Sequence, residues 1–338
     1  MGLLVVRGVL GAKQFWPGGG RSDADTATVE LAAKDPFVFV EDSGKRRVTR
    51  AFENAEVVGA QRKAPIKQSK GSAVRKITIR LQGIDAPELH YQPKVAGAPG
   101  LLHPYRQSLG ETSADALHDF VASLGVDALP CEVLTAVKKP SDVCDVYGRF
   151  VGNIVLIRGG SRIDINQWLL REGWALPGLY NSMSHAEMVA VVADHQAARQ
   201  AKRGLFSKPL VTEKLAAFNP QQLERKGPAS FKPFSDKGPV NFPKFFRRQA
   251  EHYVRDAAGQ NVPANLRAFI GTKPDDLALE RAKFLKLKGQ LTGKKPRPEF
   301  RQLATFLGGG YPFGPELVYW EKDSMLVKAG TSAEVTQW

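Results

Sequence analysis

One stretch of the chain, residues 74–89, constrains the fold more than any other. It reads V-R-K-I-T-I-R-L-Q-G-I-D-A-P-E-L, and apolar and polar side chains alternate in its first half. Ile77, Ile79 and Leu81 share one face, so the pattern predicts a strand with one buried side. The alternation ends at Gly83, and two carboxylates follow at once. A strand that leads into a turn with an arginine and two acids can hold a metal and a phosphate.

The charge of the chain points to an anionic partner. The 338 residues carry a formal net charge of +14, and residues 208–338 hold 22 lysines and arginines against 13 acids. Excess positive charge favours binding to polyanions, first nucleic acid and then anionic membranes. The alternative is that the charge only keeps the protein soluble. No apolar run approaches the ~20 residues that a membrane helix needs. We therefore expect a nucleic-acid partner and no membrane.

The first residues and the cysteines favour a cytoplasmic chain. Arg7 interrupts the apolar run at residues 3–6 and no basic segment precedes that run, so a signal peptide is not expected. Cys131 and Cys144 are too few for a zinc site and have no histidine pair at ligand spacing. They flank a predicted strand and loop, so a disulfide is conceivable. Two reduced thiols fit a cytoplasmic chain better.

The periodicity of the first two thirds of the chain predicts a barrel. Strands are predicted at residues 3–9, 27–31, 37–40, 74–82, 132–137 and 149–157, and helices at residues 111–124, 163–175 (after a short initial strand) and 185–202. Residues 34–73 are basic and poor in large apolar side chains, and we interpret them mainly as an extended hairpin or surface insertion. The order of these elements predicts an α+β fold, a five-stranded barrel of the oligonucleotide-binding (OB) type with about three packed helices.

The composition changes at residue 208. Prolines punctuate a basic stretch up to Pro243, which is typical of a linker or irregular arm. Helical periodicity then resumes, and helices are predicted at residues 242–254, 275–288 and 298–307. We therefore expect a barrel domain at residues 1–207 and a basic, mostly helical region of unknown role at residues 208–338.

Several short segments can be read together. They are D-A-D-T at residues 23–26, R-L-Q-G-I-D-A-P-E at 80–88, D-V-Y-G-R at 145–149, I-N-Q-W-L-L-R-E-G-W-A at 165–175 and A-K-R-G-L-F at 201–206. In this order they resemble the thermonuclease family, the staphylococcal-nuclease-like domains, whose pattern is D-G-D-T, R-L-x-x-x-D-x-P-E and D-x-Y-G-R. The resemblance covers roughly residues 3–207, and it implies an OB fold and hydrolysis of phosphodiester bonds.

The resemblance implies a calcium site. Its ligands would be Asp25, Asp85 and the backbone carbonyl of Ala86, and carboxylates are natural ligands of hard cations. The family has glycine where this chain has Ala24, and a long segment separates Asp25 from the strand before Asp85. Asp42 is therefore the alternative upstream ligand. Asp25 is preferred because an alternating strand follows it.

The resemblance also implies catalytic residues. Glu88 would be the general base that activates water, and Arg80 and Arg149 would clamp the phosphate with their bidentate guanidinium groups. Each of these residues alone could be an ordinary surface or turn residue. Their joint occurrence in the order of the family favours catalysis.

Substrate contacts are less well marked by the pattern. Tyr147 in the D-V-Y-G-R segment and Tyr180 after the predicted helix at 163–175 are the candidates for nucleotide contacts. The family often carries a lysine where this chain has Val146, and Lys138 and Lys139 would supply that charge from a nearby loop.

The leading hypothesis is a calcium-dependent nuclease that cleaves DNA and RNA with little sequence preference, because contacts to phosphate carry no sequence information. The resemblance implies a 3′-phosphate product. One alternative is a module of the same fold that binds nucleic acid without cutting it. Another is a nuclease that residues 208–338 direct to a protein partner. The complete set of arginines and acids favours the enzyme, and Ala24 and the long insertion leave the binding module open.

Overall fold

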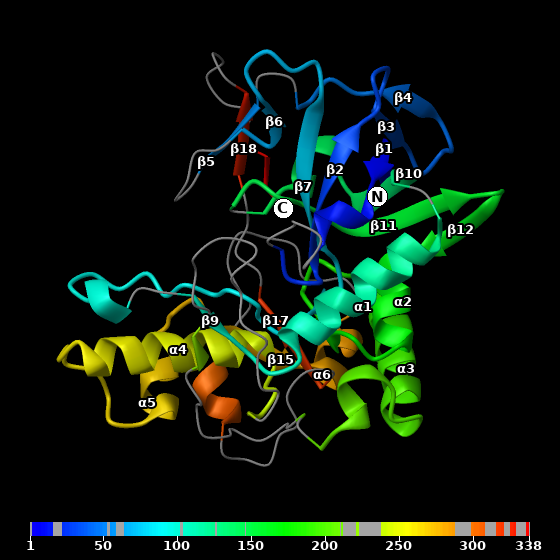
Figure 1. Ribbon diagram of the computed structural model, residues 1–338. Helices are drawn as coiled ribbons and strands as arrows, with labels where there is room; N and C mark the ends of the chain where they lie inside the picture. Colours follow the sequence, from blue (N-terminus) through cyan, green and yellow to red (C-terminus); the bar gives the residue numbers. More distant parts are fainter. Residues whose placement is uncertain are drawn as a thin grey trace.

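The computed structural model in Figure 1 gathers most strands in the upper half of the view and most helices in the lower half. The structure describes residues 2–15, 22–52, 55–58, 64–101, 104–125, 127–145, 147–209, 211, 221–222, 238–287, 299–307, 316–320, 325–328 and 336–337.

Five strands form a closed barrel, as predicted. In order around the barrel they are β1 (Gly2–Leu10), β2 (Thr26–Leu31), β7 (Arg75–Leu81), β11 (Phe150–Arg158) and β10 (Leu129–Val137). The pairing of β10 with β1 closes the ring, and β7 and β11 are parallel while the other neighbours are antiparallel. The interior contains the alternating side chains, among them Ile77, Ile79 and Leu81 of β7. This ring and its helices confirm the α+β, OB-like fold class.

Further strands extend the barrel sheet. They are β3 (Phe37–Val40), β4 (Arg46–Val48), β6 (Ile66–Gln68) and β12 (Ser161–Asp164). β3 and β4 form the hairpin expected within residues 34–73, but that segment is not confined to the surface. Phe37, Phe39 and Phe52 are buried, and the ring of Phe52 lies 4.9 Å from that of Phe150. Aromatic burial of this size contributes to the barrel core.

Three helices pack on the barrel: α1 (Gly110–Ser123), α2 (Ile165–Arg171) and α3 (His185–Gln200). Each predicted helix of this part of the chain is confirmed. α3 begins with a capping box, in which Ser184 and Glu187 exchange hydrogen bonds between side chain and backbone. α1 and α2 are linked by stacked rings of Phe120 and Trp168, with centroids 4.1 Å apart.

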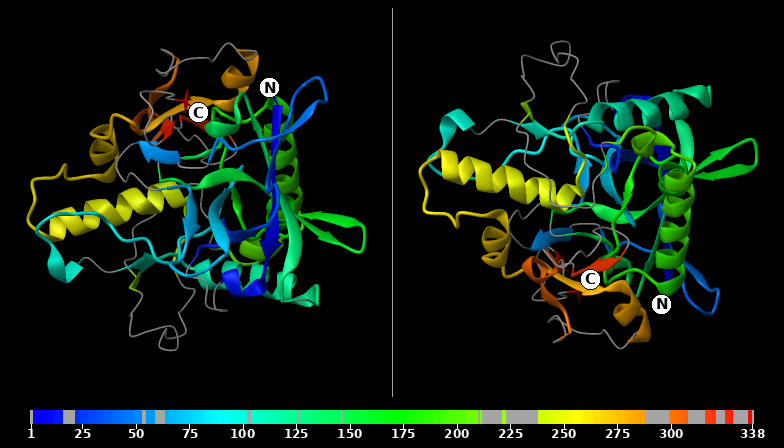
Figure 2. Two further views of the ribbon diagram at one scale, coloured as in Figure 1. Left: turned by 90° about the horizontal axis from the view of Figure 1, so that it is seen from above. Right: turned by 90° about the horizontal axis from the view of Figure 1, so that it is seen from below.

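The C-terminal region mixes helices with short strands. Its described elements are α4 (Pro243–Ala257), α5 (Leu266–Gly271), β15 (Leu277–Glu280), α6 (Arg281–Lys286), β16 (Arg301–Gln302), β17 (Leu317–Tyr319), β18 (Met325–Lys328) and β19 (Thr336–Gln337). β18 pairs with β5 (Ala55–Val58), so this region also reaches the insertion. Figure 2 shows α4, in yellow, extending away from the barrel on the side opposite to the β12 hairpin.

Two predicted helices of this region are partly wrong. Residues 277–280 form β15 between β16 and β17, and helix α6 covers only residues 281–286 of the predicted 275–288. At residues 298–307 the structure has β16 followed by a single 3-10 turn at Leu303–Phe306; residues 288–298 lie outside the described part. The backbone hydrogen bonds of β15 are made with the neighbouring strands β16 and β17. Local helix propensity does not include such pairing.

The C-terminal region shares a core with the barrel domain. Leu109 and Leu205 from the N-terminal part belong to one buried cluster with Val240, Phe242 and Tyr319. The rings of Phe242 and Tyr319 stack with centroids 5.1 Å apart. α4 is therefore packed against the barrel domain, and its side chains lie within reach of the turn after β7.

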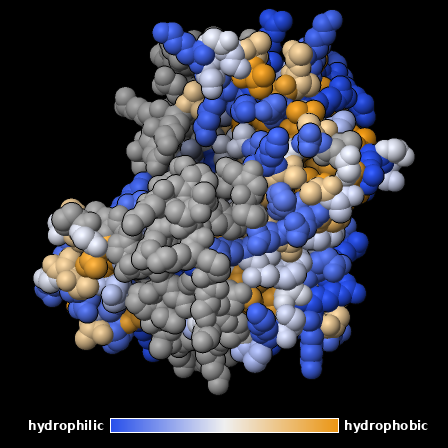
Figure 3. All heavy atoms as spheres, in the orientation of Figure 1, coloured by the Kyte–Doolittle hydropathy of each residue, from blue (hydrophilic) through white to orange (hydrophobic). Residues whose placement is uncertain are grey.

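The described surface is mainly polar on the face seen in Figure 3, with small apolar groups between hydrophilic ones. None of the helices in the described ranges is long and apolar enough to cross a membrane. Cys131 and Cys144 are both free and buried, which agrees with the expectation of two thiols.

Candidate active site

The turn after β7 is fixed by its backbone. Gly83 has φ +77°, a conformation that favours glycine, and its carbonyl accepts a hydrogen bond of 3.0 Å from the Gly178 N–H. The short strand β8 (Ile84–Asp85) pairs with β13 (Leu176–Pro177) just after α2. The chain therefore reverses sharply after the strand and presents Asp85 beside Arg80.

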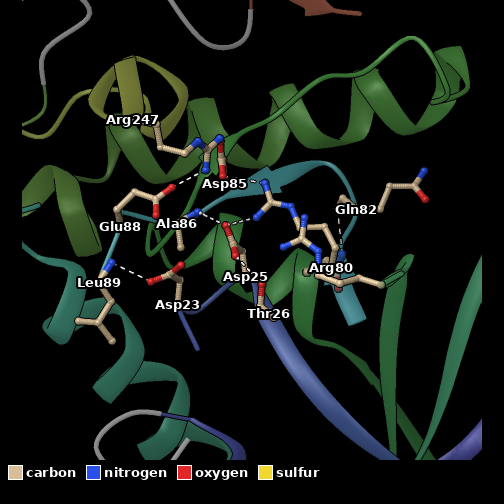
Figure 4. Close-up of polar contacts among 12 residues, drawn as sticks. Asp23, Asp25, Thr26, Arg80, Gln82, Asp85, Ala86, Glu88, Leu89 and Arg247 are labelled. Carbon is tan, nitrogen blue, oxygen red and sulfur yellow. Dashed lines mark hydrogen bonds and ion pairs between the residues drawn. The ribbon is translucent and has the colours of Figure 1, made fainter. Parts of the chain in front are cut away.

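Arg80 joins two buried aspartates. In the register of β2 with β7, Thr26 lies opposite Arg80, which places Asp25 next to the arginine. Arg80 forms an ion pair with Asp25, and its Nη2 donates to Oδ1 of Asp85 at 2.7 Å. Oδ2 of Asp25 also accepts a 2.9 Å hydrogen bond from the N–H of Ala86. Figure 4 shows these groups from separate segments meeting at one place.

The upstream aspartate of this cluster is Asp25. Asp42 is exposed in the turn between β3 and β4. Ala24 is buried, and its φ is not positive, so the turn does not require the glycine of the family pattern. The structure therefore places Asp25, as preferred from the sequence, with Asp85 and Ala86.

A further carboxylate of the site, Asp23, was not predicted. Its Oδ1 accepts a 2.7 Å hydrogen bond from the Leu89 N–H, and His90 Nδ1 lies 3.5 Å from the same oxygen. The signal for it was its place in the D-A-D-T segment, two residues before Asp25. This segment is a turn, closed by a 3.0 Å hydrogen bond from the Thr26 N–H to the Asp23 carbonyl.

Glu88 lies in the same group and is held through its backbone. Its N–H donates to Oε1 of Gln107 at 3.0 Å, and its carbonyl accepts from the Gln107 N–H at 2.8 Å. The residue is 5% exposed. This double contact orients the Glu88 carboxylate towards the aspartates.

The charged partner of Glu88 comes from α4. Nη1 of Arg247 forms an ion pair with Oε1 of Glu88, and Nη2 of Arg247 lies 3.5 Å from Oδ2 of Asp85. Figure 4 shows Arg247 and Arg80 reaching Asp85 from different elements. No local motif marks Arg247 in the sequence; its one signal is the helix predicted at residues 242–254.

Burial and neighbouring charges shift the pKa values of the carboxylates in different directions. Burial would raise the pKa of Asp25, but Arg80 and the Ala86 N–H outweigh it and lower the value to about 2. Burial raises the pKa of Glu88 to about 8: it outweighs the lowering by Arg247, and the negative charges of Asp23 and Asp85 add to the rise. Burial and the charge of Asp25 raise the pKa of Asp23 to about 7. Burial therefore favours the protonated forms of Asp23 and Glu88, whereas Asp25 stays ionised.

Arg149 lies immediately before β11, the strand that pairs with β7. β11 runs parallel to β7 with Val151 opposite Arg80. The Nε of Arg149 donates to Oδ2 of Asp145 at 2.7 Å, and its guanidinium lies over the ring of Tyr147 at 5.4 Å. Among the described residues, the partners of the Arg149 side chain thus belong to its own turn and not to the carboxylate cluster.

The other predicted substrate contacts are spread around the site. Tyr147 is 52% exposed beside Arg149. Tyr180 forms a β-bridge with Tyr319 of β17, and the centroids of the two rings are 6.2 Å apart. Lys138 and Lys139 are exposed in the loop after β10.

The carboxylates fit a hard divalent cation in chemistry and charge. Asp23, Asp25, Asp85 and Glu88 bring four carboxylates against the guanidiniums of Arg80 and Arg247, and oxygen is the donor that Ca²⁺ prefers. Within the described ranges, no three histidine, cysteine or acidic side chains are arranged to hold a metal. In this structure, oxygens of these carboxylates accept hydrogen bonds from N–H groups of the protein rather than facing a cation.

Comparison with known proteins defines the class of this site. Residues 78–208 match the family model described as staphylococcal nuclease homologue. These residues form part of a thermonuclease-like domain, as predicted, and the match supports a nuclease-type hydrolase at the level of the family. The match includes the segments of Arg80, Asp85, Glu88 and Arg149 and begins after Asp25. None of the curated proteins compared with the chain matches it.

Proposed function

We propose that the chain is a calcium-dependent nuclease that hydrolyses phosphodiester bonds in DNA and RNA with low sequence specificity. The observation that supports this most is the cluster of Asp25, before β2, with Arg80, Asp85 and Glu88, from β7 and the turn after it, in a thermonuclease-like domain. Burial of several acids and an arginine together costs free energy. Such clusters are typical of sites that bind a ligand or carry out a reaction.

The residues of the cluster divide the reaction between them. Glu88 takes the proton of the attacking water as the water oxygen bonds to phosphorus and the bond to the leaving oxygen breaks. Arg80 and Arg149 donate hydrogen bonds to the phosphate oxygens, where negative charge accumulates. Tyr147, Tyr180, Lys138 and Lys139 contact the nucleotide chain outside this centre.

Asp25, Asp85 and the carbonyl of Ala86 would hold the calcium ion. A bound Ca²⁺ would offset negative charge on the phosphate and orient the water. The N–H of Ala86 already contacts Asp25, so the three groups lie on adjoining pieces of backbone. The proposed contacts are made to phosphate and not to the bases. We therefore expect low sequence preference.

A second candidate is a module that binds nucleic acid without cleaving it. The ion pair of Glu88 with Arg247 favours this alternative, because a carboxylate engaged by an arginine is a poor general base. The two candidates differ in whether the phosphodiester bond breaks.

The test is to incubate the full chain with single-stranded DNA, double-stranded DNA and RNA, in Ca²⁺ and again in the chelator EGTA. The proposal predicts shortening of the strands in Ca²⁺, loss of cleavage in EGTA and recovery when Ca²⁺ is restored, measured on denaturing gels. Retarded migration on native gels with intact strands on denaturing gels would instead support the binding module.

A further inference from the structure

A cation from outside the thermonuclease-like domain occupies the centre of the site. Arg247 of α4 pairs with Glu88 and lies 3.5 Å from Asp85, the residues that the proposed function assigns to the water and to the calcium ion. We propose that Arg247 and a divalent cation are alternative partners of Asp85 and Glu88, so that Arg247 sets the affinity of the site for the cation. This inference rests on the proposed function.

The same oxygen atoms cannot serve both partners. Asp85 is completely buried, and its two oxygens face Arg80 and Arg247 respectively. Ca²⁺ requires oxygen ligands at about 2.3–2.6 Å, so a guanidinium beside those oxygens overlaps the space of an ion. Guanidinium and ion also carry the same sign of charge, and burial leaves their repulsion poorly screened. The Arg247 side chain must leave Asp85 when the ion binds.

The helix that carries Arg247 is firmly anchored. Arg248 donates to both oxygens of Asp276, with Nε at 2.5 Å and Nη2 at 2.9 Å. Gln107, which holds the backbone of Glu88, also donates to the carbonyl of Asn241 at 2.7 Å, just before α4 begins. The backbone of α4 is thus tied to the backbone of the site. Displacement of Arg247 therefore needs a change of its side chain and not undocking of the helix.

Removal of Arg247 leaves the rest of the cluster in place. Arg80 approaches from β7 and pairs with Oδ1 of Asp85, so that Oδ2 of Asp85, the oxygen that Arg247 faces, becomes available to an ion. Four carboxylates then face one guanidinium instead of two, which makes the site more attractive to a divalent cation. Arg247→Met preserves an unbranched apolar stem and deletes the charge, and Arg247→Lys keeps the charge without the fork that spans two carboxylates.

The experiment measures Ca²⁺ binding to the full chain by titration calorimetry at neutral pH, without nucleic acid. Arg255→Gln is the matched control, because Arg255 lies on the same helix and pairs with Glu251 and Gln260 rather than with the site. We expect Arg247→Met to bind Ca²⁺ at least about tenfold more tightly than the unchanged protein, since it loses one charge inside a buried site. Arg247→Lys should lie between them, and Arg255→Gln should match the unchanged protein.

Adding Asp85→Asn to Arg247→Met should abolish the gained affinity, which locates the ion. Circular dichroism confirms that each variant is folded. Equal affinity of Arg247→Met and Arg255→Gln, both lost with Asp85→Asn, would overturn the role of Arg247 and leave the calcium nuclease standing. Absence of Ca²⁺ binding in every folded variant would overturn the calcium site itself, and the inference with it.

Discussion

Asp25 and Glu88 are both buried acids of one cluster, yet their pKa values move in opposite directions. Asp25 receives hydrogen bonds from Arg80 and from the Ala86 N–H, which hold its pKa at about 2. Glu88 has Arg247 as its charged partner and other acids nearby, and burial raises its pKa to about 8. A base with a pKa near neutrality can both accept and release a proton. This difference suits Asp25 to a fixed charge and Glu88 to proton transfer.

His195 in α3 provides a pH-dependent term in stability. The side chain is 4% exposed, its Nδ1 has no hydrogen-bond partner within the described ranges, and burial, with Arg199 nearby, lowers its pKa to about 4. Below pH 6.5 the unfolded chain binds a proton that the folded chain refuses. Stability should therefore fall as the pH drops from 6.5 towards 4, by on the order of 3 kcal/mol from this residue.

Denaturant unfolding of the unchanged protein and of His195→Gln at pH 7 and pH 4.5 measures this term. The glutamine variant should lose less stability between the two pH values, because it cannot take up the proton. Equal losses in both proteins would show that His195 is not the group responsible.

The grouping of Arg80, Asp85 and Glu88 could be predicted from the sequence, because the three residues lie within one strand and the turn after it. The strand that follows Asp25 favoured it as the upstream acid, and Asp25 does lie beside Arg80; the metal-ligand roles of Asp25, Asp85 and Ala86 stay predictions. Arg247 was missed because its position depends on how α4 docks, and no local spacing encodes a contact 159 residues away in the chain. The roles of Arg80, Glu88 and Arg149 stay predictions.

The docking of α4 depends on the ion pair between Arg248 and Asp276. Asp276 is 2% exposed in the turn before β15, and Arg248 is the residue that contacts both of its oxygens. Arg248→Met should lower the free energy of unfolding by about 2 kcal/mol, because it leaves a buried carboxylate with Lys244 as its remaining close cation.

Urea unfolding compares Arg248→Met with Arg267→Met, which removes an arginine from α5 whose recorded hydrogen bond, to Ala304, is exposed. The first variant should have a clearly lower midpoint and the second a nearly unchanged one. A midpoint for Arg248→Met that equals that of Arg267→Met would mean that this pair does not anchor α4.

Elements with strict periodicity were predicted well, and elements that depend on partners were not. The alternation in residues 75–81 predicts β7, and the helical periodicity of residues 185–202 predicts α3. The acids and bases around residues 275–288 favoured a helix, but β16 and β17 supply hydrogen-bond partners that make Leu277–Glu280 a strand. Such pairing is a long-range effect that propensity does not contain.

The two parts of the molecule share a core and a site. Leu109 and Leu205 pack with Phe242 and Tyr319, and Arg247 completes the charge of the cluster. The strand pattern predicts the barrel. The packing of the C-terminal region against the barrel domain could not be predicted, because it depends on contacts between residues far apart in the sequence. A region that seemed an appendage in the sequence therefore contributes to the candidate active site.

The most direct test of the central claim is the cleavage rate of Glu88→Gln in saturating Ca²⁺, with single-stranded DNA and RNA as substrates. Glu30→Gln is the control, because Glu30 pairs with Lys76 at the barrel surface. If Glu88 is the general base, its variant should be slower by about 10²–10⁴-fold, with an unchanged circular dichroism spectrum, and Glu30→Gln should cleave normally. A Glu88→Gln protein that cleaves within a few-fold of the unchanged rate would contradict the account.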